Sequence, residues 1–337
     1  MREFIVNIPK AEVHIHLEGA LDPELLFLIA QRNNVTLPYS SVAELKKAYV
    51  FKNLQDFLEL CFQGMRALRT EQDFYDLMMG YLKKARSQGV VYAEISFEAQ
   101  TYAQRGIAFE TIITGINRAC GDGLAKFGIS AKLILCFLRD REEREALEVL
   151  EQILPYKDSI IAVGLASAER GNPPSKFQRV FAKAREYGFF VTVHAGEEGP
   201  AEYIWQALTL LHADRIDHGI NALQDEKLVE ELVRRQIPLT LCPLSNLKLR
   251  LVKDLREYPI KNMIAAGLLA SINSDDPAYF GGYVADNYQA VVDALNLSQQ
   301  EIIQLAKNSF QSSFLSEDEK QKMCEKVDQY VTTQTSA

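Results

Sequence analysis

Eight short runs of apolar and β-branched residues recur along the chain, with helical-period segments between them. The runs lie at 12–17, 90–97, 131–137, 160–165, 189–193, 215–217, 237–241 and 268–272. Continuous apolar strands that alternate with helices are typical of a parallel sheet covered by helices. Eight such units predict an α/β fold, a closed (β/α)8 TIM-type barrel rather than an open, doubly wound sheet.

A length of 337 residues suits one barrel domain that spans residues 1–337. Two regions exceed a minimal barrel. Approximately residues 22–89, after the first predicted strand, hold two or three helices where one would suffice, and residues 298–336 hold two terminal helices. Asp22 followed by Pro23 is a typical helix start. We expect the polar residues 332–337 to form a disordered tail.

One helix of the long region after the first strand is strongly apolar on one face. Its apolar residues recur at three- and four-residue spacing and are Leu54, Phe57, Leu58, Cys61, Phe62 and Met65. The helix either packs on the barrel as a structural addition or forms an apolar lid over the mouth. Protection of residues 50–70 from proteolysis by a tight ligand would support the lid.

Charge and composition exclude several classes of partner. The chain is 47% hydrophobic with a net charge of −8, and it has no lysine- or arginine-rich run. Nucleic acids and anionic membranes bind basic patches, so we expect neither, and a small-molecule substrate fits better. The longest apolar stretch, near 263–272, is too short to cross a bilayer. Five scattered cysteines and the lack of a signal-peptide pattern predict the cytoplasm. The oligomeric state stays open.

Four of the five histidines follow or end predicted strands. His14 and His16, two residues apart on the first strand, face the same side. His194 and His218 end the fifth and sixth strands, and the adjacent carboxylates at 275 and 276 follow the eighth. Each motif alone has an ordinary explanation: a polar strand position, a core or turn histidine, or a helix cap. The carboxyl ends of barrel strands form the catalytic face, however, so these residues would converge there.

Imidazoles and carboxylates are ligands of catalytic zinc, which keeps one position open for water. Three histidines and one aspartate therefore predict one zinc per chain. The fourth predicted strand carries no lysine that could bridge two ions. Glu197 suits a general acid, because burial raises the pKa of a carboxyl group. His218 suits a residue that holds or deprotonates the attacking water.

These motifs resemble those of the adenosine/adenine deaminase family. The resemblance covers Pro9 to about Leu305 and is strongest at 9–19, 194–197, 215–219, 242–246 and 273–277. It implies the ligand set of one zinc: His14, His16, His194 and Asp275. It also implies roles on the purine ring, with Glu197 protonating N1, His218 orienting the water, Asp276 bonding to N7 and the Gly164 backbone bonding to N3.

Several details resemble the adenine branch of that family. Adenosine-cleaving members usually carry aspartate at the position of Glu18, which becomes a candidate substrate-binding residue. The resemblance implies zinc-dependent hydrolysis of adenine to hypoxanthine and ammonia, in purine salvage or catabolism. Four residues depart from the branch pattern, which usually has aspartate, proline, histidine and aspartate at these positions: Glu98, Ala99, Tyr102 and Ala166. We expect them to influence which 6-aminopurine is preferred.

Three alternatives stay open. The chain could deaminate adenosine or another modified or substituted 6-aminopurine, and kcat/KM values for adenine, adenosine and N6-substituted adenines would separate these cases. It could catalyse a different amidohydrolase reaction, such as ring opening or ester cleavage, which the absence of the bridging lysine disfavours. It could bind zinc or purines without catalysis, which the presence of Glu197 and His218 disfavours.

Overall fold

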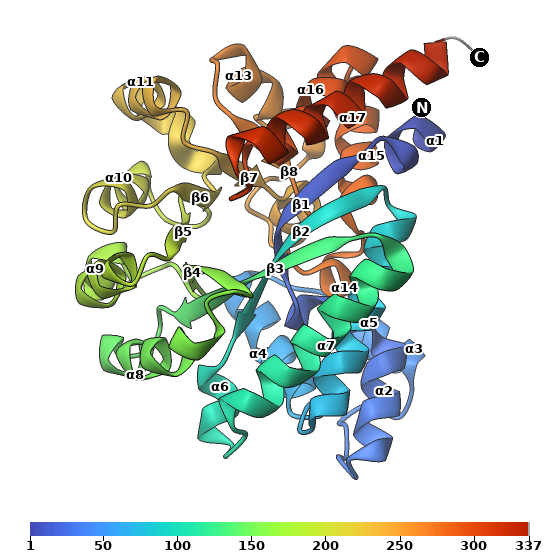
Figure 1. The fold of residues 1–337 in the computed structure, drawn as a ribbon, viewed down its shortest axis with the longest axis vertical. Coiled ribbons are helices and arrows are strands. Elements are labelled where there is room, and N and C mark those ends of the chain that lie inside the picture. The colour runs from blue at the N-terminus through green and yellow to red at the C-terminus, as the bar shows by residue number, and fades with distance from the viewer. Residues whose placement is uncertain (336–337) are drawn as a thin grey trace.

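Eight parallel strands form the centre of the molecule and follow one another around it in chain order (Figure 1). The computed structural model describes residues 1–335. The strands are β1 (Lys10–His16), β2 (Val90–Glu98), β3 (Ser130–Leu138), β4 (Ile160–Ala166), β5 (Phe190–Ala195), β6 (Arg215–His218), β7 (Leu239–Leu241) and β8 (Ala270–Ile272). All eight predicted strands are confirmed, and their ends shift by no more than two residues.

Hydrogen bonds between β1 and the residues after β8 close the ring. The His16 N–H donates to the Asp275 carbonyl at 2.9 Å, and the Asp275 N–H donates to the His14 carbonyl at 3.2 Å. The Asn273 side chain accepts from the Val13 N–H at 2.9 Å. The fold is therefore the predicted (β/α)8 barrel, and it closes beside three of the predicted site residues.

An outer layer of helices surrounds the strands (Figure 1). Its members are α5 (Glu71–Ser87), α7 (Phe109–Phe127), α8 (Glu143–Ile153), α9 (Gln178–Glu186), α10 (Ala201–Thr209), α11 (Glu226–Arg235), α13 (Ile260–Ala265), α15 (Val284–Leu295) and α16 (Gln299–Gln311). Each turns an apolar stripe inward. In α11, for example, Leu228 and Leu232 are buried, and the Asp225 side chain caps the helix by accepting two backbone N–H groups.

Shorter elements connect these layers. The short α-helices are α1 (Arg2–Asn7), α6 (Gln100–Gln104), α12 (Pro243–Lys248) and α14 (Pro277–Phe280). The 3-10 helices are η1 (Glu18–Ala20), η2 (Leu154–Tyr156), η3 (Pro174–Phe177), η4 (Ile220–Gln224) and η5 (Leu255–Glu257). No helix among residues 1–335 combines the length and apolar character that a bilayer crossing requires.

The region between β1 and β2 holds one helix more than the sequence predicts. It contains α2 (Pro23–Arg32), α3 (Val42–Ala48), α4 (Leu54–Met65) and α5. The additional helix is α3, which has seven residues, buries only Leu45 and is capped by Ser41, whose side chain accepts from the Glu44 N–H. A helix this short, with a single buried position, leaves almost no periodic signal in the sequence.

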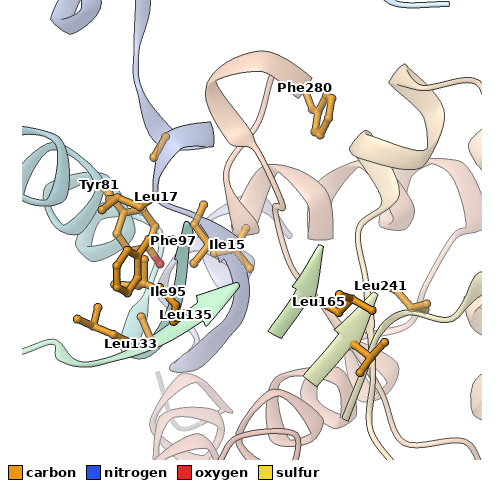
Figure 2. Close-up of a cluster of buried hydrophobic side chains, with 14 of the residues drawn as sticks. Ile15, Leu17, Tyr81, Ile95, Phe97, Leu133, Leu135, Leu165, Leu241 and Phe280 are labelled. Atoms are coloured by element: carbon orange, nitrogen blue, oxygen red, sulfur yellow. The ribbon is translucent and has the colours of Figure 1, made fainter. Parts of the chain in front are cut away.

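Buried apolar side chains fill the space between the barrel and its helices. Ile15, Ile95 and Leu133 are register partners on three neighbouring strands, so their side chains form a row across the sheet. Figure 2 shows these residues close to Phe97 and to Tyr81, which comes from α5. This packing on the outer face leaves the inner face of β1 free to direct His14 and His16 into the barrel.

The C-terminal segment covers the amino-terminal ends of the strands. The Phe314 ring stacks on Phe190, at the start of β5, with 4.6 Å between ring centroids. The last helix, α17 (Glu317–Thr335), buries Cys324 and Val327 in a second apolar cluster with residues of β1. It continues to Thr335, whereas the sequence predicts a disordered tail from residue 332. Residues 332–334 are exposed, and the hydroxyl groups of Thr332 and Thr333 donate to carbonyls of the preceding turn of the helix. Residues 336 and 337 lie outside the described residues.

Candidate active site

Four histidines and one aspartate meet at the carboxyl ends of the strands. His14 and His16 come from β1, His194 from β5 and His218 from the end of β6, and Asp275 follows β8. The Nε2 atoms of His16 and His194 lie 3.0 Å apart. Asp275 Oδ1 lies 3.3 Å from His14 Nε2 and 3.5 Å from His16 Nε2. The structure thus brings together motifs that are far apart in the sequence.

This cluster has the composition and spacing of a metal site. Two overlapping groups have ligand atoms within 4.8 Å of one another: His14, His194, His218 and Asp275, and His16, Asp275 and Asp276. Among the described residues, the buried Nε2 atom of His14 has no hydrogen-bond partner. Two imidazole nitrogens at 3.0 Å also need a cation or a proton between their lone pairs. The residues present therefore fit a bound divalent cation.

Asp217 orients two of the imidazoles. His14 Nδ1 lies 2.9 Å from the Thr240 hydroxyl, which donates to Asp217 Oδ1 at 2.9 Å. The other carboxylate oxygen lies 3.4 Å from His194 Nδ1 and accepts from the Thr192 hydroxyl at 2.6 Å. The Thr240 hydroxyl at Nδ1 directs Nε2 of His14 towards the centre of the cluster, and Asp217 lies beside Nδ1 of His194, as second-layer carboxylates do in metal sites.

Two residues of the cluster have an unusual backbone conformation. His218 and Asp275 have φ angles of 65° and 64°, in the left-handed region that non-glycine residues rarely adopt. Such residues cluster at functional sites, where the surrounding structure offsets their cost of about 1–3 kcal/mol. His218 Nε2 lies 3.9 Å from Asp275 Oδ2 and 3.6 Å from Glu197 Oε1. His218 therefore stands between the metal cluster and the candidate acid.

A tight loop after β5 carries Glu197. The Glu169 carboxylate accepts the backbone N–H groups of residues 196–199 at 2.8–3.0 Å and so fixes the loop. Gly196 has a φ of 68°, and a Cβ there would lie 2.5 Å from a side-chain atom of α10. Burial raises the pKa of the Glu197 carboxyl well above its usual range, and the charge of Asp275 raises it further. Glu197 is therefore suited to donate a proton.

Asp276 lies against the turn that follows β1. A Cβ on Gly19 would lie 2.0 Å from Asp276 Oδ1, so only glycine fits there without displacing the carboxyl group. Burial, with the neighbouring Asp275, raises the pKa of Asp276 well above its usual range. The Asp276 side chain also lines the cavity, where it can form a hydrogen bond with a ligand.

A cavity opens beside the cluster, and its lining includes His16, His194, His218 and Asp275. One wall is formed by six apolar side chains of α4: Leu54, Phe57, Leu58, Cys61, Phe62 and Met65. These are the residues whose spacing predicts a helix in this region. The helix therefore lines the site, which gives the cavity an apolar wall opposite its ionisable groups.

The sector of the cavity formed by η1 and β2 carries two buried carboxyl groups. The Glu98 N–H donates to Glu18 Oε1 at 3.3 Å, and the Tyr102 hydroxyl donates to the same oxygen at 3.4 Å. Burial raises the pKa of Glu18 to about 8 and that of Glu98 to about 7.

Gly164 of β4 is the register partner of Cys136, which lines the cavity, and a Cβ on Gly164 would lie 2.7 Å from Cys136 Sγ.

Sequence reasoning misses three residues that support this site. Asp217 belongs to the motif of His218, but its partners come from other strands. Glu169 follows β4 without a recognisable motif. Arg139, which is fully buried, donates to the His194 carbonyl at 2.6 Å. The role of each residue depends on a contact with a distant element, and a single sequence gives no information about such contacts.

Comparison with known proteins identifies the family. A family model described as adenosine deaminase matches residues 9–330. The chain belongs to the adenosine deaminase family. It is therefore a hydrolytic deaminase, and the resemblance seen in its motifs is confirmed.

Close relatives of this deaminase carry the name adenine deaminase. One from Acinetobacter baylyi is 53% identical over 97% of this chain and 98% of its own length. One from Sphingopyxis alaskensis is 53% identical over 97% of this chain and 96% of its own length.

Solved structures show the same fold. The crystal structure of adenine deaminase from Arthrobacter aurescens matches with a TM-score of 0.94 and 48% identity, over 96% of this chain and 99% of that chain. An amidohydrolase from Burkholderia ambifaria, solved with bound Zn, matches with a TM-score of 0.91 and 24% identity, over 100% of this chain and 95% of that chain. At that identity the second match shows the fold alone.

Proposed function

We propose that this deaminase hydrolyses adenine to hypoxanthine and ammonia, in purine salvage or catabolism, with one zinc ion per chain. The observation that carries the proposal is the position of Glu197, His218 and Asp276 around a single metal-type cluster that borders the cavity. The relatives named adenine deaminase, at about half identity over nearly the whole chain, support adenine as the substrate.

The proposed zinc ligands are His14, His16, His194 and Asp275. The family resemblance selects His16 as the third imidazole, although His218 is the histidine that shares a group of mutually close ligand atoms with His14, His194 and Asp275. His16 Nε2 lies 3.0 Å and 3.5 Å from atoms of two other ligands, whereas His218 Nε2 lies 3.9 Å from Asp275 and closer to Glu197. A zinc ion held there would supply Lewis acidity and lower the pKa of water to about 7.

The side chains would divide the chemistry among them. Glu197, held as an acid, gives its proton to N1 of the ring and makes C6 electrophilic. His218 holds the attacking water and accepts its proton, which then passes to the departing amino group. Asp276 forms a hydrogen bond with N7, the Gly164 backbone forms one with N3, and Glu18 contacts the substrate from η1. As ammonia leaves and the C6=O bond forms, the hydroxyl proton at C6 returns to Glu197, so that water and adenine become hypoxanthine and ammonia and the acid is restored.

Replacement of the acid tests this division directly. Glu197→Gln should lower kcat for ammonia release by about 10²–10⁴-fold, because it removes the proton donor, and it should retain the metal. Glu198→Gln is the matched control, since the neighbouring carboxylate pairs with Arg170 and does not line the cavity. Ammonia release and metal content would be measured on both variants. Near-wild-type turnover in Glu197→Gln would rule out the acid assignment.

A substrate panel distinguishes adenine from adenosine and from other substituted 6-aminopurines. The panel is needed because Glu98 and Ala166, which depart from the adenine-branch pattern, both line the cavity. We expect the highest kcat/KM for adenine. A strong preference for the nucleoside or for an N6-substituted base would replace adenine in the proposal and leave the deamination chemistry unchanged.

We also propose a cytoplasmic location and a small-molecule purine as the binding partner. The net charge of −8 and the lack of a basic run support the absence of nucleic-acid and membrane partners. Electrophoretic mobility shift with mixed DNA and RNA fragments would check this, and retarded nucleic acid at physiological salt would contradict it.

A further inference from the structure

The side chain of Glu98 has an oxygen atom that nothing in the described protein satisfies. Glu98 is the last residue of β2, and its side chain is 6% exposed. Its Oε2 atom accepts the Thr101 N–H at 2.8 Å, whereas its buried Oε1 atom has no hydrogen-bond partner among residues 1–335. A buried polar atom left unpaired is costly, so this oxygen calls for a partner that the protein itself does not supply.

Strand geometry directs this oxygen into the cavity. Glu94 and Glu98 lie four residues apart on β2, so their side chains point to the same face of the sheet. Glu94 pairs with Arg215 of β6, across the barrel interior, at 2.5 Å. Glu98 therefore also points into the barrel, nearer than Glu94 to the carboxyl ends of the strands. It lines the cavity together with Cys136 and Ala166.

The proposed orientation of the substrate brings a particular edge of the purine to this oxygen. This step rests on the proposed function. With C6 at the metal cluster, N1 at Glu197 and N7 at Asp276, the ring turns its N3–N9 edge away from β5 and β8. The strands β2 to β4 carry none of the proposed zinc ligands, and they face that edge of the ring. In a free purine base the edge presents an N9–H donor beside the N3 acceptor.

We propose that Glu98 determines specificity for the free base, because its Oε1 atom accepts a hydrogen bond from N9–H. On the nearby wall, Ala166 and Cys136 are in apolar contact with each other, and the other polar side chains there are Ser167 and Glu18. A substituent on N9 removes the donor and also occupies the space in front of the carboxyl group. Sites built to bind an N–H group reject analogues that lack it far more strongly than apolar pockets reject an extra methyl group.

The test compares adenine with 9-methyladenine, which differs from it only at N9. The measured quantity is the ratio of kcat/KM for adenine to kcat/KM for 9-methyladenine, or the ratio of inhibition constants if the methylated base is not turned over. In the wild type we expect adenine to be favoured at least about 100-fold. In Glu98→Ala the kcat/KM for adenine should fall roughly 10- to 100-fold while that for 9-methyladenine stays or rises, so that the ratio collapses.

Two further variants separate this role from a structural one. Glu98→Gln keeps the shape and the contact with Thr101, and it should restore part of the preference for adenine. Glu110→Gln, an exposed residue on α7, should keep the wild-type ratio. Equal losses on both bases in Glu98→Ala would overturn the inference, because a structural defect lowers both alike. A wild type without activity on adenine would instead refute the proposed function itself.

Discussion

Asp217 is the residue on which the geometry of the metal cluster depends most. It reaches His194 directly and His14 through Thr240, and Arg215 Nε lies 3.5 Å from the same carboxylate. Its pKa lies well below the usual range, because the charges of His14, His194 and Arg215 outweigh the effect of burial. An ionised carboxylate in this place holds the Nδ1 protons and leaves the Nε2 lone pairs for the metal.

Asp217→Asn should weaken metal binding about 10- to 100-fold, because the amide is neutral and can turn a donor towards the imidazoles. Asp293→Asn, at an exposed position on α15, is the matched control. Metal affinity would be measured by competition with a chromophoric chelator. An affinity equal to that of the wild type would show that Thr240 and the backbone orient the imidazoles without Asp217.

The loop after β5 shows how one element positions a side chain for another. Glu169, in the connection after β4, accepts four consecutive N–H groups of this loop, and its side chain is fully buried. The contact fixes the direction in which Glu197 leaves the strand. The loop itself can be predicted from His194, Gly196 and Glu197, but Glu169 cannot, since nothing in the sequence pairs it with residues almost thirty positions away.

Glu169→Gln should lower kcat about 10²-fold and retain the metal, because the amide cannot accept all four N–H groups and Glu197 loses its position. Glu202→Gln on the surface of α10 serves as the comparison. Ammonia release and metal content, measured together, check the prediction. If metal and activity were lost together, Glu169 would be supporting the cluster rather than the acid.

At the scale of the whole molecule, one buried ion pair ties the barrel to the C-terminal segment. Arg215 Nη1 lies 2.5 Å from Glu94 Oε2 and donates to the Ser312 carbonyl at 3.1 Å. The Phe314 ring lies 4.4 Å from the same guanidinium, and both charged side chains are fully buried. The pair thus links β2, β6 and the segment between α16 and α17 beneath the active site.

Arg215→Met should lower the free energy of unfolding by about 3–5 kcal/mol, because it leaves the buried Glu94 carboxylate without its partner. Urea denaturation followed by circular dichroism would measure the change. Arg256→Met is the control, since this arginine forms an exposed ion pair with Asp254, and its midpoint should match the wild type. An unchanged midpoint for Arg215→Met would contradict the stabilising role of this ion pair.

The barrel can be predicted from the sequence because its strands are continuous apolar runs with regular spacing. The predicted site residues come together for the same reason, since they lie where those runs end, as His194 and His218 do. What the sequence does not reveal is set by long-range contacts or by weak local patterns. The helix α3, the extension of α17 and the ion pair of Arg215 with Glu94 are of this kind.

In the proposed function, the deamination of adenine requires one metal ion held by residues of β1 and β5 and by Asp275. The most direct measurement is a titration of metal-free protein with Zn²⁺ while ammonia release from adenine is recorded. Activity should be absent at the start, rise in proportion to added zinc and level off at one equivalent per chain. Full activity in the metal-free protein, or none on adenine after loading, would contradict the account.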